Sequence, residues 1–230
     1  MKIIIYATHS FGTYETLIKH PDVICIGFGT KWEGFVQKAE TVCHYLNDLP
    51  DDEIVAVIDG FDSYIKKTKD IENEFLKKEC KVLVSLHNTW FNFEYLEKKV
   101  FSSCKKNKTA NSGLIMGYAK EMKEVWNSMK NGPSSDDQRN LNLACEKIPY
   151  IKVDAECTIF ENCNNLNHVQ KSNAYICQIP GDVSLQRFIR SIFEYSRYFI
   201  FEIMIIVLIL FLFIQSKRPN FMKMKSRTKS

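Results

Sequence analysis

Short apolar runs alternate with longer periodic stretches through the first half of the chain. The runs are rich in β-branched residues and almost continuous, which is typical of strands buried on both faces. Strands that alternate with helices predict an open, mostly parallel sheet with right-handed crossovers. The predicted strands are residues 2–7, 23–29, 53–59 and 81–86, and the predicted helices are residues 9–20, 32–48 and 68–79.

The second half of the chain is less regular. Residues 91–109 are aromatic and then Lys-rich, which predicts a mobile loop. Ser134 or Ser135 is predicted to cap a helix that runs to Cys145, with two acidic residues in its first turn. The remaining predictions are a strand or turn at 111–119, a helix at 120–129, and strands at 150–154 and 174–179.

Residues 198–214 form an apolar stretch whose one charge is Glu202. A helix of this length would be about 25 Å long, against a hydrocarbon core of about 30 Å. Arg197 precedes the stretch and Lys217-Arg218 follows it, so that these basic side chains could reach the headgroups. A buried core helix is the alternative, but a basic tail follows with no further fold to cover it. We therefore expect a single membrane-spanning helix.

The net charge of +4 is due to this tail. The tail has no acidic residue, and the rest of the chain is slightly acidic. A nucleic-acid-binding protein carries its basic charge on the fold, so we do not expect a nucleic-acid role. The basic residues of the tail are Lys217, Arg218, Lys223, Lys225, Arg227 and Lys229.

Two rules conflict over the orientation in the membrane. Basic flanks favour a cytoplasmic tail, which would put the N-terminal domain on the lumenal side. The start of the chain has one Lys and a short apolar run, which resembles a strand rather than a secretory signal. That favours a tail-anchored protein with a cytosolic domain. We take the cytosolic orientation as the first interpretation and the lumenal one as the alternative.

The eight cysteines include no CxxC pair, which argues against a zinc knuckle. Several lie inside apolar runs, such as Cys25 in VICIGFG. We expect buried free thiols that behave as small hydrophobic residues rather than a disulfide framework.

The strongest chemical signal is VIDGFD, in which a buried strand ends at Asp59 and Asp62 follows three residues later. Ligands of open α/β sheets bind beyond the carboxyl ends of the strands. Two carboxylates there can hold Mg²⁺ or Mn²⁺ against a diphosphate and neutralise its developing charge. The alternative is an aspartate that caps a turn. The chain has neither GxxxxGK[ST] nor GxGxxG, which argues against the phosphate-binding loops that carry these motifs.

Further candidate groups lie in the turn ANSGLIMGY and in the segment SSDDQ. The amide of Asn111 suits a hydroxyl-rich ligand. Asp136 and Asp137 could serve either in the site or as a helix start. Trp32 and Trp90 could stack on a base or a sugar, whereas Trp126 lies inside a predicted helix and is expected in the core. His87 is near this proposed sugar pocket, but a lone histidine is usually structural.

Seven of these motifs, taken in order, resemble the glycosyltransferase domain of procollagen lysyl hydroxylases and, more distantly, the collagen galactosyltransferases. They are IIIYATH, GFGTKWEG, VIDGFDSYI, LVSLHNTW, NSGLIMGYA, DDQ and VDAECTIFEN. The resemblance covers about residues 2–182. It implies a GT-A-like, Rossmann-type mixed sheet flanked by helices. It also implies Mn²⁺ as cofactor and a UDP-sugar as donor.

The resemblance implies a role for each matching residue. Asp59 and Asp62 match the metal ligands. Asn111, Asp136 and Asp137 match residues needed for transfer. The residues matched to donor binding are Thr8, Trp32, Lys38 and Trp90.

The chain departs from the family at the third metal ligand, a late histidine, because Gln178 stands there in YICQIPGD. A neutral amide oxygen is a weaker ligand than imidazole. Two hypotheses follow: a hexosyltransferase acting on a hydroxyl of a protein or glycan, with hydroxylysine or galactosyl-hydroxylysine of a collagen-like protein as the family's acceptors, or a catalytically impaired, membrane-tethered relative that binds sugar or protein. A third is an adaptor without sugar chemistry.

The predicted organisation has four parts along the chain. A glycosyltransferase-like domain spans 1–182, a juxtamembrane helix or linker 183–197, the transmembrane helix 198–214, and the basic tail 215–230.

Overall fold

The computed structural model describes residues 1–88, 94–105, 108–181 and 195–217 of the chain. Its contacts divide the chain into two compact units, Met1–Gly181 and Asp182–Ser230. Each is described by itself.

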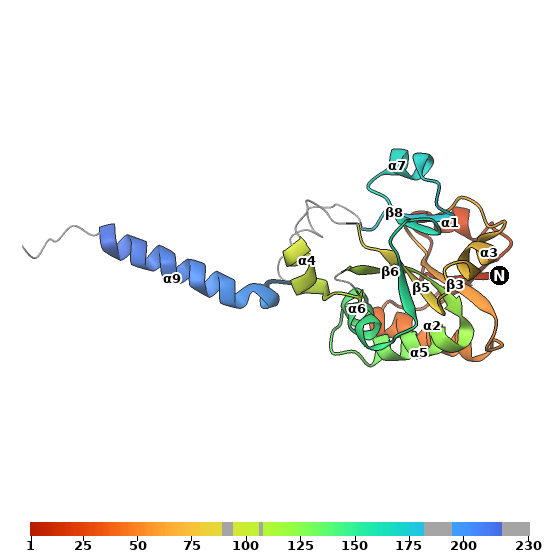
Figure 1. Cartoon of the computed structure of the whole chain (residues 1–230), viewed down its shortest axis with the longest axis horizontal. Coiled ribbons are helices and arrows are strands. Elements are labelled where there is room, and N and C mark those ends of the chain that lie inside the picture. The colour runs from red at the N-terminus through yellow and green to blue at the C-terminus, as the bar shows by residue number, and fades with distance from the viewer. Residues whose placement is uncertain (89–93, 106–107, 182–194, 218–230) are drawn as a thin grey trace, which may run out of the picture. The chain divides into compact units, whose positions relative to one another are not determined.

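A six-stranded sheet forms the centre of the first unit (Figure 1). Its order is β2-β1-β3-β6-β5-β7, in which β6 is antiparallel to both neighbours and the other pairings are parallel. The predicted mixed α/β sheet is therefore confirmed. The strands are β1 (Lys2–Tyr6), β2 (Val23–Ile26), β3 (Ile54–Asp59), β5 (Val82–Leu86), β6 (Ala110–Tyr118) and β7 (Ile151–Asp154).

Helices cover both faces of this sheet. Successive side chains of a strand point to opposite faces, and apolar side chains on both faces pack against helices. In β1, Ile4 packs with α2, α5 and α6, whereas Ile3 and Ile5 pack with α1 and α3 on the other face. Figure 1 shows these helices as separate layers. Their bounds are α1 (Tyr14–Leu17), α2 (Phe35–Asn47), α3 (Ile71–Leu76), α5 (Ala119–Lys130) and α6 (Asp137–Lys147).

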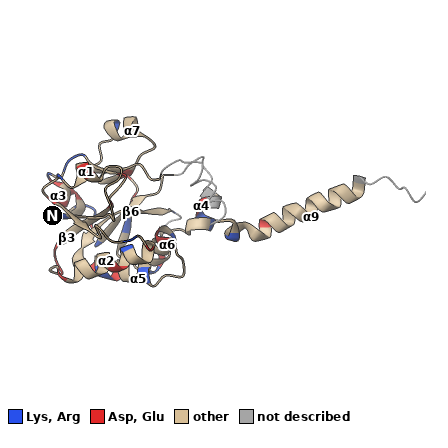
Figure 2. Ribbon diagram, turned by 180° about the vertical axis from the view of Figure 1, so that it is seen from behind, with Lys and Arg blue, Asp and Glu red and all other residues tan. Residues whose placement is uncertain are grey.

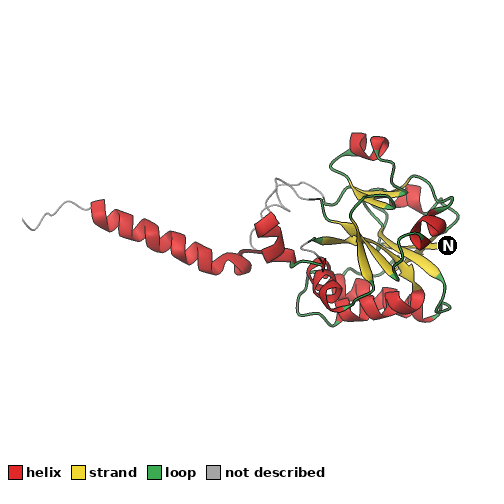
Figure 3. Cartoon of the chain, viewed as in Figure 1, coloured by secondary structure: helices red, strands yellow, loops and turns green. Residues whose placement is uncertain are grey.

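A small second sheet lies beside the first (Figure 3). It consists of β4 (Ser63–Ile65), β9 (Ile176–Gln178) and β8 (Phe160–Asn162), in the order β4-β9-β8. Helix α7 (Leu166–Lys171) connects β8 to β9. Ser63, the residue directly after the VIDGFD motif, pairs with Gln178. This pairing brings the motif next to a segment more than a hundred residues later in the sequence.

Several sequence-based predictions are wrong in detail. The helices predicted at 9–20 and 68–79 shrink to α1 and α3. The prediction of a strand or turn at 111–119 is confirmed as a strand, although β6 begins one residue earlier and is nine residues long. The predicted mobile loop contains helix α4 (Glu94–Phe101), and the Lys105 ammonium that follows donates to the carbonyls of Ile148 and Ile151 at 2.8 and 3.1 Å.

The expectation of free thiols is wrong for two cysteines. Cys104 and Cys145 form a disulfide, with Cα atoms 5.1 Å apart, which is in the normal range. The bond joins the segment before β6 to helix α6, a contact between distant parts of the chain that spacing alone does not indicate. The other cysteines are free, as predicted: Cys25, Cys43, Cys80, Cys157, Cys163 and Cys177.

Within the second unit, a 3₁₀ turn (Arg197–Phe199) leads into helix α9 (Ile200–Lys217). Residues Arg197–Ser216 are long and apolar enough to cross a membrane, with a mean hydropathy of 2.7, and none of the span is buried. At 1.5 Å per residue they reach about 30 Å. Figure 2 shows most of α9 without charged residues. Most of the predicted linker at 183–197 and of the basic tail at 215–230 lies outside the described residues.

Candidate active site

Asp59 and Asp62 flank the tight turn that joins β3 to β4. Gly60 makes this turn possible, because a Cβ there would lie 2.8 Å from the Tyr6 carbonyl oxygen. The turn leaves both carboxylates at the carboxyl end of β3, where the sequence analysis expected them.

Gln178 lies between the two carboxylates. Its Nε2 donates to Asp59 Oδ2 at 2.9 Å and to Asp62 Oδ1 at 3.0 Å. Its Oε1 is buried and makes no hydrogen bond to the described residues. The structure thus brings the three residues matched to metal ligands into one cluster.

Lys38 joins this cluster from helix α2. Its ammonium lies 2.6 Å from Asp59 Oδ1 and 3.3 Å from Asp137 Oδ2. Burial alone would lower the pKa of Lys38, but the two carboxylates outweigh it and raise that pKa. The ammonium is therefore charged, and it links an acid of β3 to an acid of α6.

Burial also raises the pKa values of two acids in the cluster. It raises the pKa of Asp62 to about 7, with the neighbouring Asp59 charge adding to the effect and the Gln178 hydrogen bond opposing it. Burial likewise raises the pKa of Asp137, against the stabilising charge of Lys38. Raised pKa values mean that both acids resist ionisation in this buried setting, and a bound cation would favour their ionised forms.

An irregularity in β6 brings the asparagine turn to the cluster. Pairing with β5 jumps from Val84–Ile115 to Ser85–Asn111, so residues 112–114 face no partner on β5. Bulges of this kind often redirect side chains at functional sites. A Cβ on Gly113 would lie 2.2 Å from Gln178 Oε1 and 2.6 Å from Asp59 Oδ2, so the missing side chain makes room for the cluster.

The acid pair at 136–137 has two separate functions. Asp136 is the N-cap of α6 and accepts a hydrogen bond from the Arg139 amide at 2.8 Å. The prediction of Ser134 or Ser135 as the cap is therefore wrong. Asp137 points to Lys38 and also hydrogen-bonds with Ser112.

Two residues matched to donor binding, Thr8 and Trp32, follow the strands β1 and β2. Thr8 is buried after β1, and Trp32 follows β2 with its ring 5.8 Å from that of Tyr6. Trp90 lies outside the described residues. Trp126 is fully buried, as predicted. Ser112 and Gly113 were not predicted as site residues, although both belong to the NSG motif that contains Asn111.

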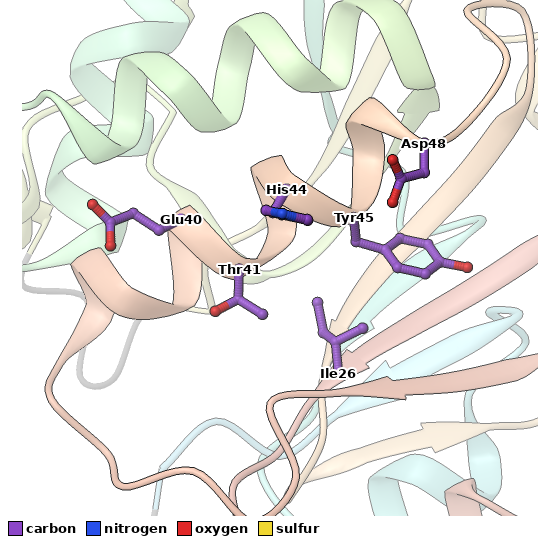
Figure 4. A pocket seen from close by; sticks show the side chains of 6 residues that line it. All are labelled: Ile26, Glu40, Thr41, His44, Tyr45 and Asp48. Carbon is purple, nitrogen blue, oxygen red and sulfur yellow. The ribbon is translucent and has the colours of Figure 1, made fainter.

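Two other features are separate from this cluster. Glu161, Cys163 and His168 have ligand atoms within 4.8 Å of one another, a possible metal site. The contacts already pair them, since His168 Nδ1 accepts from the Asn164 amide and Nε2 lies 2.9 Å from Glu161. A hollow of about 420 Å³ lies along α2 and the end of β2 (Figure 4). It is lined by Ile26, Glu40, Thr41, His44, Tyr45 and Asp48.

Known proteins resemble this chain in sequence and in fold. The PLOD GT domain family matches residues 8–176, well over half of the chain. Among solved structures, a glycosyltransferase involved in the glycosylation of the major capsid of PBCV-1 shares the fold, with a TM-score of 0.50 and 14% identity. The match covers 79% of this chain and 96% of that one. No curated protein matches the chain. The chain belongs to the PLOD GT domain family and is a glycosyltransferase.

Proposed function

We propose that this glycosyltransferase moves a hexose from a UDP-sugar to a hydroxyl acceptor with the help of Mn²⁺. The observation that carries the proposal is the cluster of Asp59, Asp62 and Gln178 at the carboxyl end of β3. The acceptor would be a hydroxyl-bearing protein or glycan. Hydroxylysine or galactosyl-hydroxylysine of a collagen-like protein is the candidate that the family suggests.

The donor atoms of the cluster fit such a cation. Mn²⁺ and Mg²⁺ prefer oxygen ligands, which both aspartates supply. Gln178 supplies a third if its amide rotates by 180°, because Oε1 and Nε2 then exchange places. The rotation exchanges the two hydrogen bonds that Nε2 donates to Asp59 and Asp62 for a contact of Oε1 with the cation. Oε1 itself loses no partner, because it makes no hydrogen bond to the described residues. A bound cation would supply Lewis-acid stabilisation of the charge that develops on the departing nucleoside diphosphate.

The chain's own residues would orient the donor and protect the reaction. Lys38 fixes the positions of Asp59 and Asp137 and provides a buried positive charge near the diphosphate. Asn111 would hold sugar hydroxyls, and Asp137 would position the donor or acceptor. Asp136 would support this by fixing the first turn of α6. Thr8 and Trp32 would contact the nucleotide, and Trp90 the sugar.

The test is the double variant Asp59→Asn, Asp62→Asn. We expect the wild type to bind UDP more tightly as Mn²⁺ is added, and to hydrolyse or transfer from at least one UDP-sugar. In the double variant the Mn²⁺ dependence of UDP binding should vanish, and turnover should fall at least about 100-fold, since the ionic ligands are lost. Unchanged turnover in the variant would refute the metal assignment.

A second candidate function is a catalytically impaired relative that binds sugar or a partner protein. Gln178 favours it, because a neutral amide replaces a stronger ligand and its Nε2 lies between the aspartates. The same titration separates the two candidates. UDP binding without any effect of Mn²⁺ would support the impaired relative.

We further propose that α9 anchors the chain in a membrane with the catalytic unit on the lumenal side. The disulfide supports this side rather than the cytosolic one, because disulfides persist in oxidising compartments and are rare in the cytosol. Basic residues after α9 favour a cytoplasmic tail, in agreement with that orientation.

The state of the thiols tests this orientation. When protein from its native membrane is denatured, a maleimide reagent should label six cysteines before reduction and all eight after it. Cys104→Ser should add Cys145 to the labelled set before reduction, whereas Cys80→Ser should remove one label in both states. Eight labels without reductant would favour the cytosolic orientation.

A further inference from the structure

A line of polar side chains leads from Asn111 away from the acidic cluster. Asn111 Nδ2 donates to Gln138 Oε1 at 3.3 Å, and Gln138 Nε2 lies 3.2 Å from His87 Nδ1. His87 Nε2 lies 3.7 Å from Glu97 Oε1. Asn111 lies in β6 and Gln138 in α6. His87 directly follows β5, and Glu97 lies in α4 (Glu94–Phe101).

The direction of this line is determined at its inner end. Asn111 Oδ1 accepts a hydrogen bond from the Gly113 amide at 2.8 Å, so Nδ2 is the atom that faces Gln138. Gln138 must then present Oε1 to Asn111 and Nε2 to His87. Since Nε2 of glutamine only donates, His87 Nδ1 must accept, and the proton of a neutral His87 ring lies on Nε2.

The outer end of the line supports the same tautomer. The Glu97 side chain is 13% exposed, and its Oε2 is buried without a hydrogen bond to the described residues. A carboxylate in that position attracts the Nε2 proton of His87, and carboxylates commonly fix histidine rings in this way. The His87 amide also donates to the Thr109 carbonyl at 2.9 Å, which fixes the backbone beside the ring.

We propose that Glu97, His87 and Gln138 are positioning residues that hold the Asn111 amide in the orientation needed by the sugar donor. In this proposal none of the three contacts the substrate. The inference rests on the proposed role of Asn111 in donor binding, and it makes helix α4 a support of the site. Without an acceptor at His87, Gln138 Nε2 would be left unpaired in a buried position, and rotation of its amide would oppose two donors at Asn111.

The test compares two substitutions of His87 in the full-length protein. In His87→Asn, the side-chain oxygen takes the place of Nδ1 and still accepts from Gln138, so kcat/KM should stay within about threefold of wild type. His87→Leu removes the acceptor and should lower kcat/KM for the UDP-sugar about tenfold. His44→Leu, on the exposed side of α2, is the matched control and should have no effect. Equal loss in His87→Asn and His87→Leu would overturn the proposal.

A second measurement does not depend on activity. The Gly113 amide lies outside the pairing of β6 with β5, and its partner is Asn111 Oδ1. Its hydrogen exchange therefore reports the orientation of Asn111. We expect exchange at Gly113 to rise at least about threefold in His87→Leu and to remain unchanged in His87→Asn. Equal exchange in wild type and His87→Leu would overturn the inference. Absence of any transfer by the wild type would instead refute the proposed function, and exchange would still decide the positioning role.

Discussion

Replacing Gly113 with alanine is expected to reduce glycosyl transfer by about 100-fold or more while leaving the fold intact. The added Cβ would lie 2.2 Å from Gln178 Oε1 and 2.6 Å from Asp59 Oδ2. The glutamine amide is the end of a flexible side chain, so it can move at little cost to stability. Its movement removes Gln178 from between the two aspartates. Turnover of a UDP-sugar and the melting temperature, both measured with Mn²⁺, check this expectation.

Gly117→Ala provides the matched control, four residues further along β6. Its Cβ would lie 2.6 Å from the Lys81 carbonyl oxygen, so the backbone pairing with β5 must open. This variant should melt at a lower temperature but retain the turnover of wild type for each folded molecule. If Gly113→Ala retains full turnover, the cluster is not the catalytic centre.

The largest loss of stability is expected for Asp154→Ala. The Asp154 carboxylate is fully buried at the end of β7 and accepts from the amides of Ile159 and Phe160 at 2.7 and 2.9 Å. It also pairs with the Lys78 ammonium at 3.2 Å. Removing one partner of a buried ion pair costs about 3–5 kcal/mol, which corresponds to a fall in melting temperature of roughly 10 °C.

Glu156→Ala separates this burial effect from simple loss of charge. Glu156 pairs with the same Lys78 ammonium at 3.1 Å, but its side chain is 79% exposed. Exposed ion pairs contribute little, so the melting temperature should change by less than about 2 °C. Thermal unfolding of both variants, followed by circular dichroism, provides the measurement. Similar losses in both would show that the turn after β7 does not depend on the buried carboxylate.

The sequence predicts the strands well where apolar runs are long. The core of β3 is a continuous apolar run in which all residues except Ala56 are β-branched, and such runs have few alternatives to a buried strand. Strands β4 and β8 have three residues each, which is too short for periodicity to reveal. They form only because β9 lies between them in space.

The same distinction between local patterns and distant contacts applies to the candidate site. Asp59 and Asp62 were identifiable because both lie in one strand-end motif. The contact of Gln178 with them depends on the pairing of β4 with β9, which no local pattern indicates. The room provided by Gly113 and the disulfide of Cys104 with Cys145 likewise arise from segments that are distant in sequence.

Lys38 has a consequence for how the proposed cation and donor exchange during turnover. Its ammonium and the Gln178 amide contact the two oxygens of Asp59, so this carboxylate has a counter-ion within the fold. The scaffold then does not need a resident metal for its integrity. The cation would behave as an exchangeable co-substrate that enters with the nucleotide and leaves with it after each cycle.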